Sequence, residues 1–363
     1  MPCCLLAALL EVASGIPLMA VDGRKIRVLV VDDSTLCRDL LAEILEADPA
    51  LELAGSAVDG ADAVEKVVDL APDVVTMDLR MPKMDGIEAT TAIMEKRPTP
   101  ILVLTGHPFQ SGRNMTFDAI RAGALDLMIK PDLGVGAEVE QLGSDLARMI
   151  KFVAQLDVTQ AGAPAASPAE GEKRPIAAVA MAASVGGPRA VHSVLSALPA
   201  DFPTGIVLVQ HITEGFVDEF AAWLDSESEL RVRVAEQDDE VVPGQVLVAP
   251  AECHVRLMPG GHCKLIRGQP INGYRPSADV LFSSLARVHG ELACGVILSG
   301  MGEDGVTGLS DIKSRGGLTL VQDEGPDVGE GMPHASREKG AAEHLVALEN
   351  VAAELVGRCG PAE

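Results

Sequence analysis

The sequence predicts an α/β protein of two domains, each built on a mostly parallel sheet with helices on both faces. Three observations support this fold class: the length of 363 residues exceeds that of a usual single domain, short apolar runs alternate with amphipathic segments, and a stretch rich in Ala and Pro divides the chain. Hydrophobic residues make up 47% and charged residues 23%, which is typical of globular proteins and not of disordered ones.

The first domain is predicted over residues 24–154, after an apolar extension of residues 1–23 that we expect to be disordered. The extension lacks a basic start and is interrupted by Glu11, so we predict neither a signal peptide nor a membrane span. Short, nearly continuous apolar runs, each followed by a helical pattern, indicate buried parallel strands. These predicted strands are 26–31, 53–57, 74–77, 101–104 and 127–129.

Residues 155–175 form the predicted linker, because Ala, Pro, Gly and charged residues follow no hydrophobic period there. The second domain is predicted over residues 176–357. Its predicted strands are 176–183, 206–210, 246–249, 296–299 and 318–322. Residues 255–257 and 264–266 flank Pro259-Gly260-Gly261, so we expect a β-hairpin inserted in this sheet.

Composition also limits the partners that the chain could have. With 29 basic and 53 acidic residues the net charge is −24, and only 2% of the residues are aromatic. Such a chain repels phosphate backbones and has few platforms for stacking bases, so we expect no nucleic-acid partner. Its seven cysteines are scattered and odd in number, which favours reduced thiols and a cytoplasmic protein.

Polar residues follow four predicted strands of the first domain. Asp32 and Asp33 come after the first strand, and Asp78 comes after the third. Thr105 and Lys130 come after the fourth and the fifth. Ligands of open α/β sheets bind at the carboxyl ends of the strands, so we expect these side chains to converge. Clustered carboxylates favour Mg²⁺, and a shielded aspartate beside a lysine suits phosphoryl transfer, although each aspartate alone is more often a helix or turn cap.

These residues stand in the segments VLVVDDS, VVTMDLRMPKMDG, LTG and IKP, and here the sequence resembles the receiver domain of two-component response regulators. The resemblance implies a flavodoxin-like (βα)5 fold, Asp78 as the residue phosphorylated by a histidine kinase, and Thr105 and Lys130 as switch residues. The implied Mg²⁺ ligands are Asp32, Asp33, Asp78 and the carbonyl of Arg80. One departure is Leu127, which stands where the family often has an aromatic switch residue.

The second domain carries a possible nucleophile, base and orienting acid. Ser184 follows a predicted strand and precedes a Gly-Gly turn, His211 ends the next long strand, and Asp304 lies in a Gly-rich loop after a third strand. Three strand ends of one parallel sheet can bring such residues together. Each residue alone is more often structural, and the order Ser, His, Asp without a G-x-S-x-G elbow excludes a close α/β-hydrolase relative.

The segments AASVGGP, VQHI, YRPSADVLF, LSGMGEDG and VQDEGPDVGEGMPHA extend the likeness to the second domain. From residue 24 to about residue 356 the chain resembles the chemotaxis response regulator protein-glutamate methylesterases, which join a receiver to a serine esterase. The resemblance implies a Rossmann-like, doubly wound esterase domain in which Ser184 attacks methylated glutamates of chemoreceptors, aided by His211 and Asp304. Backbone amides of Met301 and Val185 would bind the oxyanion, and hydrolysis would need no cofactor.

The same resemblance implies that receptor glutamines are also deamidated, and that a phosphorylated receiver activates the esterase. Val185 and Tyr274 depart from the family's usual Thr and His, so the alternative is an adaptor with little or no catalysis. Cys253-His254 and His262-Cys263 superficially suggest a zinc site. Neighbouring residues of a strand point to opposite faces, so we interpret these four as ordinary strand residues.

Overall fold

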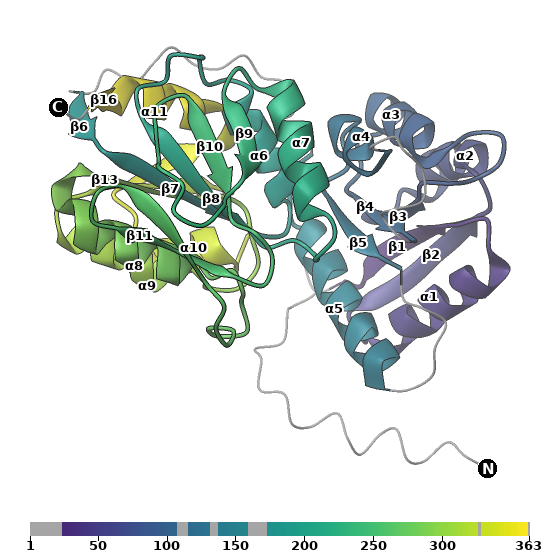
Figure 1. Ribbon diagram of the computed structural model, residues 1–363. Helices are drawn as coiled ribbons and strands as arrows, with labels where there is room; N and C mark the ends of the chain where they lie inside the picture. Colours follow the sequence, from purple (N-terminus) through teal and green to yellow (C-terminus); the bar gives the residue numbers. More distant parts are fainter. Residues whose placement is uncertain (1–23, 107–114, 131–136, 159–172, 326–327, 362–363) are drawn as a thin grey trace.

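The computed structural model describes residues 24–106, 115–130, 137–158, 173–325 and 328–361. Figure 1 shows two α/β bodies that follow one another along the chain, the first coloured purple to teal and the second teal to yellow. The predicted extension of residues 1–23 and most of the predicted linker lie outside the described residues. Within the described part, no helix combines the length and the apolar character that crossing a bilayer requires.

Five parallel strands form the first sheet in the order β2-β1-β3-β4-β5, which confirms the predicted fold of this domain. Its strands are β1 (Ile26–Val31), β2 (Leu51–Ala57), β3 (Val74–Asp78), β4 (Ile101–Thr105) and β5 (Asp126–Ile129). Its helices are α1 (Thr35–Ala47), α2 (Gly60–Leu70), α3 (Gly86–Lys96), α4 (Met115–Arg121) and α5 (Ala137–Val153). Leu29 and Val31 of β1 join one apolar cluster and Val28 and Val30 join another, so helices cover both faces.

The second domain is built on seven parallel strands in the order β15-β14-β13-β7-β8-β10-β9. These strands are β7 (Ala178–Ala183), β8 (Gly205–Gln210), β9 (Arg231–Val234), β10 (Gln245–Val248), β13 (Ala293–Ile297), β14 (Leu318–Asp323) and β15 (His344–Ala347). The helices are α6 (Gly187–Leu195), α7 (Val217–Glu227), α8 (Ala278–His289), η3 (Gly290–Leu292), α9 (Val306–Ser314), α10 (Met332–Glu338), η4 (Leu348–Asn350) and α11 (Val351–Arg358). Side chains of β7 alternate between two apolar clusters, so this sheet too is covered on both faces.

Three expectations about the second domain need correction. The predicted strand 176–183 is two strands, because β6 (Arg174–Ile176) leaves the main sheet to pair with β16 (Cys359–Pro361). The apolar pattern does not change between them, so the pattern carries no sign of the break. The predicted hairpin exists as β11 (His254–Met258) and β12 (His262–Ile266), but it forms a sheet of its own and is not inserted in the large one. The edge strands β9 and β15 were not predicted.

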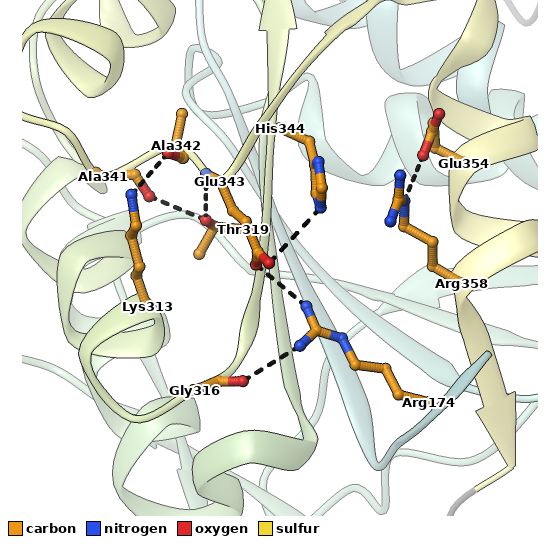
Figure 2. A network of polar contacts seen from close by, with 10 residues as sticks. All are labelled: Arg174, Lys313, Gly316, Thr319, Ala341, Ala342, Glu343, His344, Glu354 and Arg358. Atoms are coloured by element: carbon orange, nitrogen blue, oxygen red, sulfur yellow. Dashed lines mark hydrogen bonds and ion pairs between the residues drawn. The ribbon is translucent and has the colours of Figure 1, made fainter. Parts of the chain in front are cut away.

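A polar network fixes the starts of β14 and β15 at the end of the sheet where these strands begin (Figure 2). The Thr319 hydroxyl donates to the carbonyl of Ala341 at 2.9 Å and accepts the N–H of Glu343 at 2.8 Å. Arg174 of β6 donates to the Glu343 carboxylate at 3.1 Å and to the carbonyl of Gly316. These contacts hold the edge strand β15 and the short strand β6 against the sheet.

The two domains meet through one face of the first. Phe117 of α4 packs against two rings of α7, with its centroid 5.3 Å from that of Trp223 and 5.5 Å from that of Phe220. Arg121 of α4 forms an ion pair with Glu227, also on α7, at 3.3 Å. The α4–α7 part of the interface therefore consists of packed aromatic rings with an ion pair.

Candidate active site

An acidic cluster lies at the carboxyl edge of the first sheet. Asp32, Asp33 and Asp78 each offer a carboxylate oxygen, and the three oxygens lie within 4.8 Å of one another. The Nζ atom of Lys130 lies 2.8 Å from Asp32 and 2.9 Å from Asp78. Its backbone N–H donates to the carbonyl of Thr105 at 2.7 Å. The structure thus brings together the five residues that the sequence selected here.

The charges in this cluster explain its chemistry. Burial raises the pKa of Asp78, and the hydrogen bond and positive charge of Lys130 oppose that rise. Burial also lowers the pKa of Lys130, but its bonds to Asp32 and Asp78 outweigh burial and hold that pKa above its ordinary value. The three carboxylates are oxygen ligands that suit a divalent cation, so these residues fit Mg²⁺. The carbonyl of Arg80 as a further ligand stays a prediction.

A carboxylate that the sequence analysis did not select connects this domain to the second one. Asp126 begins β5, next to Leu127, and is only 6% exposed. Its Oδ1 accepts the N–H of Leu127 at 2.7 Å, and its Oδ2 accepts the N–H of Gly186 at 2.8 Å. Burial raises the pKa of Asp126 to about 7 against the effect of these two bonds. An acidic residue inside an apolar strand was the only sign of it in the sequence.

Ser184 stands at the end of β7, where the strand turns into α6. Its N–H donates to the carbonyl of Ser299 at 2.9 Å, and its carbonyl accepts the N–H of Gly187 at 2.9 Å. Gly186 has φ of +75°, a conformation that favours glycine, and it begins the helix. A Cβ atom on Gly300 would lie 2.7 Å from the Cβ of Ser184, so only glycine lets that loop approach so closely. The serine is therefore held by backbone bonds at a tight turn.

His211 lies beside this turn on the neighbouring strand. Its N–H donates to the carbonyl of Ala183 at 2.9 Å, so its backbone is adjacent to that of Ser184. Its Nε2 lies 3.0 Å from Oδ2 of Asp304. Its Nδ1 is buried and has no hydrogen-bond partner among the described residues, Ser184 included. The structure therefore forms the histidine–aspartate half of the predicted relay and leaves the other ring nitrogen free to accept a proton.

Asp304 is the most constrained member of the three. Oδ1 accepts the hydroxyl of Ser277 at 2.7 Å, and Oδ2 accepts the N–H of Ala278 at 2.6 Å in addition to bonding His211. Burial favours a higher pKa, but these bonds and the charge of His211 outweigh it and hold the pKa of Asp304 below its ordinary value. Asp304 is thus an ionised, fixed acceptor that can orient the imidazole.

The two residues predicted to bind an oxyanion lie next to this group. Val185 follows Ser184 directly, and Met301 lies in the loop that carries Asp304. Among the described residues no group accepts a hydrogen bond from either backbone N–H. The Val185 side chain joins an apolar cluster with Phe152 of α5, and Met301 and Leu156 pack against that cluster. In this chain, the residue that replaces the expected Thr therefore contacts the end of the first domain.

Sequence reasoning missed two supporting residues. Ser277 is bonded to Asp304, and its N–H also donates to Nδ1 of His254 at 3.2 Å. Gln210 donates from Nε2 to the carbonyls of Ser184 and His211, at 2.8 and 3.0 Å, and so ties the two loops together. The sequence offered one signal for each: Ser277 is a polar residue directly before a helix, and Gln210 is a polar residue at the end of a strand. Both ring nitrogens of His254 are engaged, Nε2 by the carbonyl of Gln269 and Nδ1 by the N–H of Ser277, which agrees with its interpretation as an ordinary strand residue and not a zinc ligand.

Comparison with known proteins agrees with this geometry. A family model described as CheB methylesterase matches residues 179–355, and one described as response regulator receiver domain matches residues 28–134. A protein-glutamate methylesterase/protein-glutamine glutaminase 2 of Koribacter versatilis is 39% identical over 340 residues, which are 89% of this chain and 93% of the relative. The chain belongs to the protein-glutamate methylesterase/protein-glutamine glutaminase family.

A second relative and a solved domain are also similar to this chain. The protein-glutamate methylesterase/protein-glutamine glutaminase 2 of Pseudomonas aeruginosa is 40% identical over 337 residues, covering 91% of this chain and 96% of its own. The crystal structure of the Thermotoga maritima CheB methylesterase catalytic domain is 35% identical and covers 50% of this chain and 98% of its own, with a TM-score of 0.48. In this methylesterase-family chain, the receiver match contains the acidic cluster, and the methylesterase match contains the Ser184, His211 and Asp304 group.

Proposed function

We propose that this protein is a phosphorylation-activated methylesterase that removes γ-methyl esters from glutamates of chemoreceptors and also deamidates receptor glutamines. The observation that supports it most is the pairing of His211 with the ionised Asp304 beside a serine at a tight turn. The acidic cluster of the receiver domain, in the same chain, supports regulation by phosphorylation. Membership of the methylesterase family makes this the expected activity.

The acylation step follows from the groups at the turn. Ser184 attacks the γ-carbonyl carbon of the methylated glutamate, while the free Nδ1 of His211 takes the hydroxyl proton. Asp304 keeps the other ring nitrogen bonded and offsets the charge of the imidazolium. The N–H groups of Val185 and Met301 donate to the oxyanion of the tetrahedral intermediate. The C–O bond to methanol then breaks as His211 returns the proton to the leaving oxygen.

The second half of the cycle uses the same groups in reverse. His211 takes a proton from water, the hydroxide attacks the glutamyl ester of Ser184, and the serine leaves with its proton restored. A glutamine side chain gives the same acyl intermediate with ammonia as the leaving group. One fixed arrangement therefore serves both the esterase and the deamidase reaction, and neither needs a cofactor.

The receiver controls access to the Ser184 site. Phosphorylation of Asp78 by a histidine kinase adds about −1.5 to −2 charge next to Lys130. Mg²⁺ held by Asp32, Asp33 and Asp78 would neutralise charge on the phosphoryl group during its transfer. With Asp78 modified, Lys130 and Thr105 re-pair with the phosphoryl group, and the adjacent β5 and α4 lose their present contacts with the esterase domain. We place the whole cycle in the cytoplasm, where kinases of this type and the receptor signalling regions lie.

Methanol release from methylated receptor membranes tests the proposal directly. The wild-type protein with Mg²⁺ and a small-molecule phosphodonor should release methanol faster than without the phosphodonor. Ser184→Ala should abolish release, whereas Ser196→Ala, at an exposed position after α6, should release methanol like the wild type. Equal turnover by Ser184→Ala and the wild type would refute the assignment of the nucleophile.

The alternative is an adaptor without hydrolysis, which the Val185 and Tyr274 departures favour. A serine-directed fluorophosphonate separates the two possibilities without any knowledge of the receptor. Labelling of the wild type that disappears in Ser184→Ala supports the esterase. No labelling, together with no methanol release, supports the adaptor.

A further inference from the structure

We propose that Tyr274 is a positioning residue for the catalytic base: its ring lies against the His211 imidazole and holds it on Asp304. This inference rests on the proposed function, since it assigns a role within the same site. Tyr274 is the single tyrosine of the chain, so a role of its ring can be tested at one position.

The first observation is the stacking itself. The ring centroids of Tyr274 and His211 are 4.4 Å apart, and the planes differ by 19°, which is close to parallel. A ring in that place prevents the imidazole from turning about its side-chain bonds. As His211 accepts the serine proton, the electron-rich face of the tyrosine also attracts the imidazolium. The stack therefore fixes the base and favours its charged form during the reaction.

The second observation is that the backbone of Tyr274 is itself fixed. Tyr274 and Ile271 exchange two backbone hydrogen bonds of 2.9 and 3.0 Å across a tight turn. The turn residues Asn272 and Gly273 both have positive φ. Three residues further on, Ser277 is bonded to Asp304 at 2.7 Å. The tyrosine is thus anchored by the turn on one side and by the Asp304 network on the other.

The third observation links Tyr274 to the loop that precedes Asp304. A Cβ atom on Gly302 would overlap the Tyr274 hydroxyl, and Gly302 has φ of +82°. Burial, and next the charge of Asp304, raise the pKa of Tyr274, so the hydroxyl stays neutral at physiological pH. A neutral ring wedged between His211 and the loop of Met301 positions the base and the proposed oxyanion donor relative to one another.

Two substitutions distinguish the ring from the hydroxyl. Tyr274→Phe keeps the stack and should keep most of the wild-type kcat. Tyr274→Leu fills a similar volume without a ring, and kcat should fall about ten- to hundred-fold, the cost of a misplaced catalytic group, with KM unchanged. The fluorophosphonate labelling rate of Ser184 should fall in parallel, because it also needs the base.

A spectroscopic measurement tests the stack without any turnover. Tyr274 is the single tyrosine of the chain and there are eight histidines, so protein with labelled Tyr and His should show one pair of aromatic rings in contact. Cross-relaxation between Tyr274 and His211 is expected in the wild type. In Tyr274→Phe protein with labelled Phe and His, the introduced ring should show the same contact with His211. The His211 ring signals should shift in Tyr274→Leu as the ring-current effect disappears.

Several results would overturn the proposal: no contact between the two rings, a wild-type kcat in Tyr274→Leu, an equal loss in Tyr274→Phe and Tyr274→Leu, or a change confined to KM. The last result would mean that Tyr274 contacts the receptor. Failure of the proposed function is distinguishable. In that case the wild type releases no methanol, while cross-relaxation between the Tyr274 and His211 rings, which needs no turnover, still tests the stack.

Discussion

The carboxylate of Asp126, in the receiver domain, accepts a 2.8 Å hydrogen bond from the N–H of Gly186, two residues after Ser184, the proposed nucleophile of the esterase domain. The two residues are 60 positions apart in sequence, and the bond joins the start of β5 to the turn that carries Ser184. No basic side chain contributes to the pKa of Asp126, which is shifted only by burial and by two backbone bonds. Docking of the domains therefore buries a carboxylate that has two backbone hydrogen bonds but no positive charge beside it.

That burial makes docking depend on pH, and the sign follows from the raised pKa. Burial moves the pKa of Asp126 from 3.8 to about 7, so the docked state holds a proton that the open, hydrated state has lost. Docking is strongest at low pH, weakens as the pH rises from about 4 to about 7, and then levels off. The full difference is on the order of 4 kcal/mol. Small-angle scattering of the unphosphorylated protein should show more open molecules at about pH 7.5 than at about pH 5.5.

Replacement of Asp126 by Asn should flatten this pH dependence, because the side chain no longer titrates. Asp69→Asn, at an exposed position of α2, is the matched control and should keep the wild-type dependence. Burial also raises the pKa of Glu324 to about 7. Glu324→Gln therefore measures how much of the pH dependence of docking comes from Glu324. A pH dependence of Asp126→Asn as steep as that of the wild type would contradict the role of Asp126.

The single tryptophan of the chain should report the opening of the domains. Trp223 is 3% exposed and stacks on Phe117 of the receiver and on His192. Addition of Mg²⁺ and a phosphodonor should separate Phe117 from it, shift its emission to the red and increase its quenching by acrylamide. Asp78→Asn should show neither change. Activation of the esterase with unaltered emission would mean that opening does not involve α4 and α7.

Replacement of Asp304 should lower kcat far more than replacement of its hydrogen-bond partner Ser277. Asp304→Asn places an amide that can donate where His211, Ala278 and Ser277 also donate, so kcat should fall about 10⁴-fold, as for the equivalent change in serine hydrolases. Ser277→Ala removes one of these hydrogen bonds and leaves the carboxylate bound by the others. Its kcat should fall about tenfold, for a loss of about 1 to 1.5 kcal/mol. Methanol release measures both, and equal losses would show that Ser277 acts directly.

The sequence pattern grouped the residues of both candidate sites because each group follows strand ends, whereas their roles came from the family resemblance. Short apolar runs marked most of the central strands, and the polar residues after them converge as parallel topology requires. The edge strands β9 and β15 were both missed, and in β9 two arginines interrupt the apolar run that marks the predicted strands. Short edge strands carry little hydrophobic signal.

Contacts between distant segments could not be predicted in the same way. The hydrogen bond from Gly186 to Asp126 depends on how the two domains dock. The apolar periodicity within each domain predicts its own strands and helices but not the docking. The same holds for Tyr274, whose contact with His211 arises from a turn and not from a repeating pattern. The sequence showed that residue 274 was unusual, and only the fold showed what it touches.

Substitutions in the network of Figure 2 should lower the stability of the protein without changing kcat. Thr319 is fully buried, and its hydroxyl serves the carbonyl of Ala341 and the N–H of Glu343. Thr319→Val takes this partner away from both backbone groups, so the free energy of unfolding should fall by about 1 to 3 kcal/mol. Arg174→Ala breaks a half-exposed ion pair and should cost under about 1 kcal/mol.

Denaturant unfolding of the two variants checks this order, and methanol release checks that the site is intact. Thr319 lies at the start of β14, whereas the proposed catalytic residues follow the opposite ends of β7, β8 and β13, so kcat should stay at the wild-type value in both variants. A larger loss of stability in Arg174→Ala than in Thr319→Val would mean that the surface ion pair, and not the buried hydroxyl, holds β15 in place.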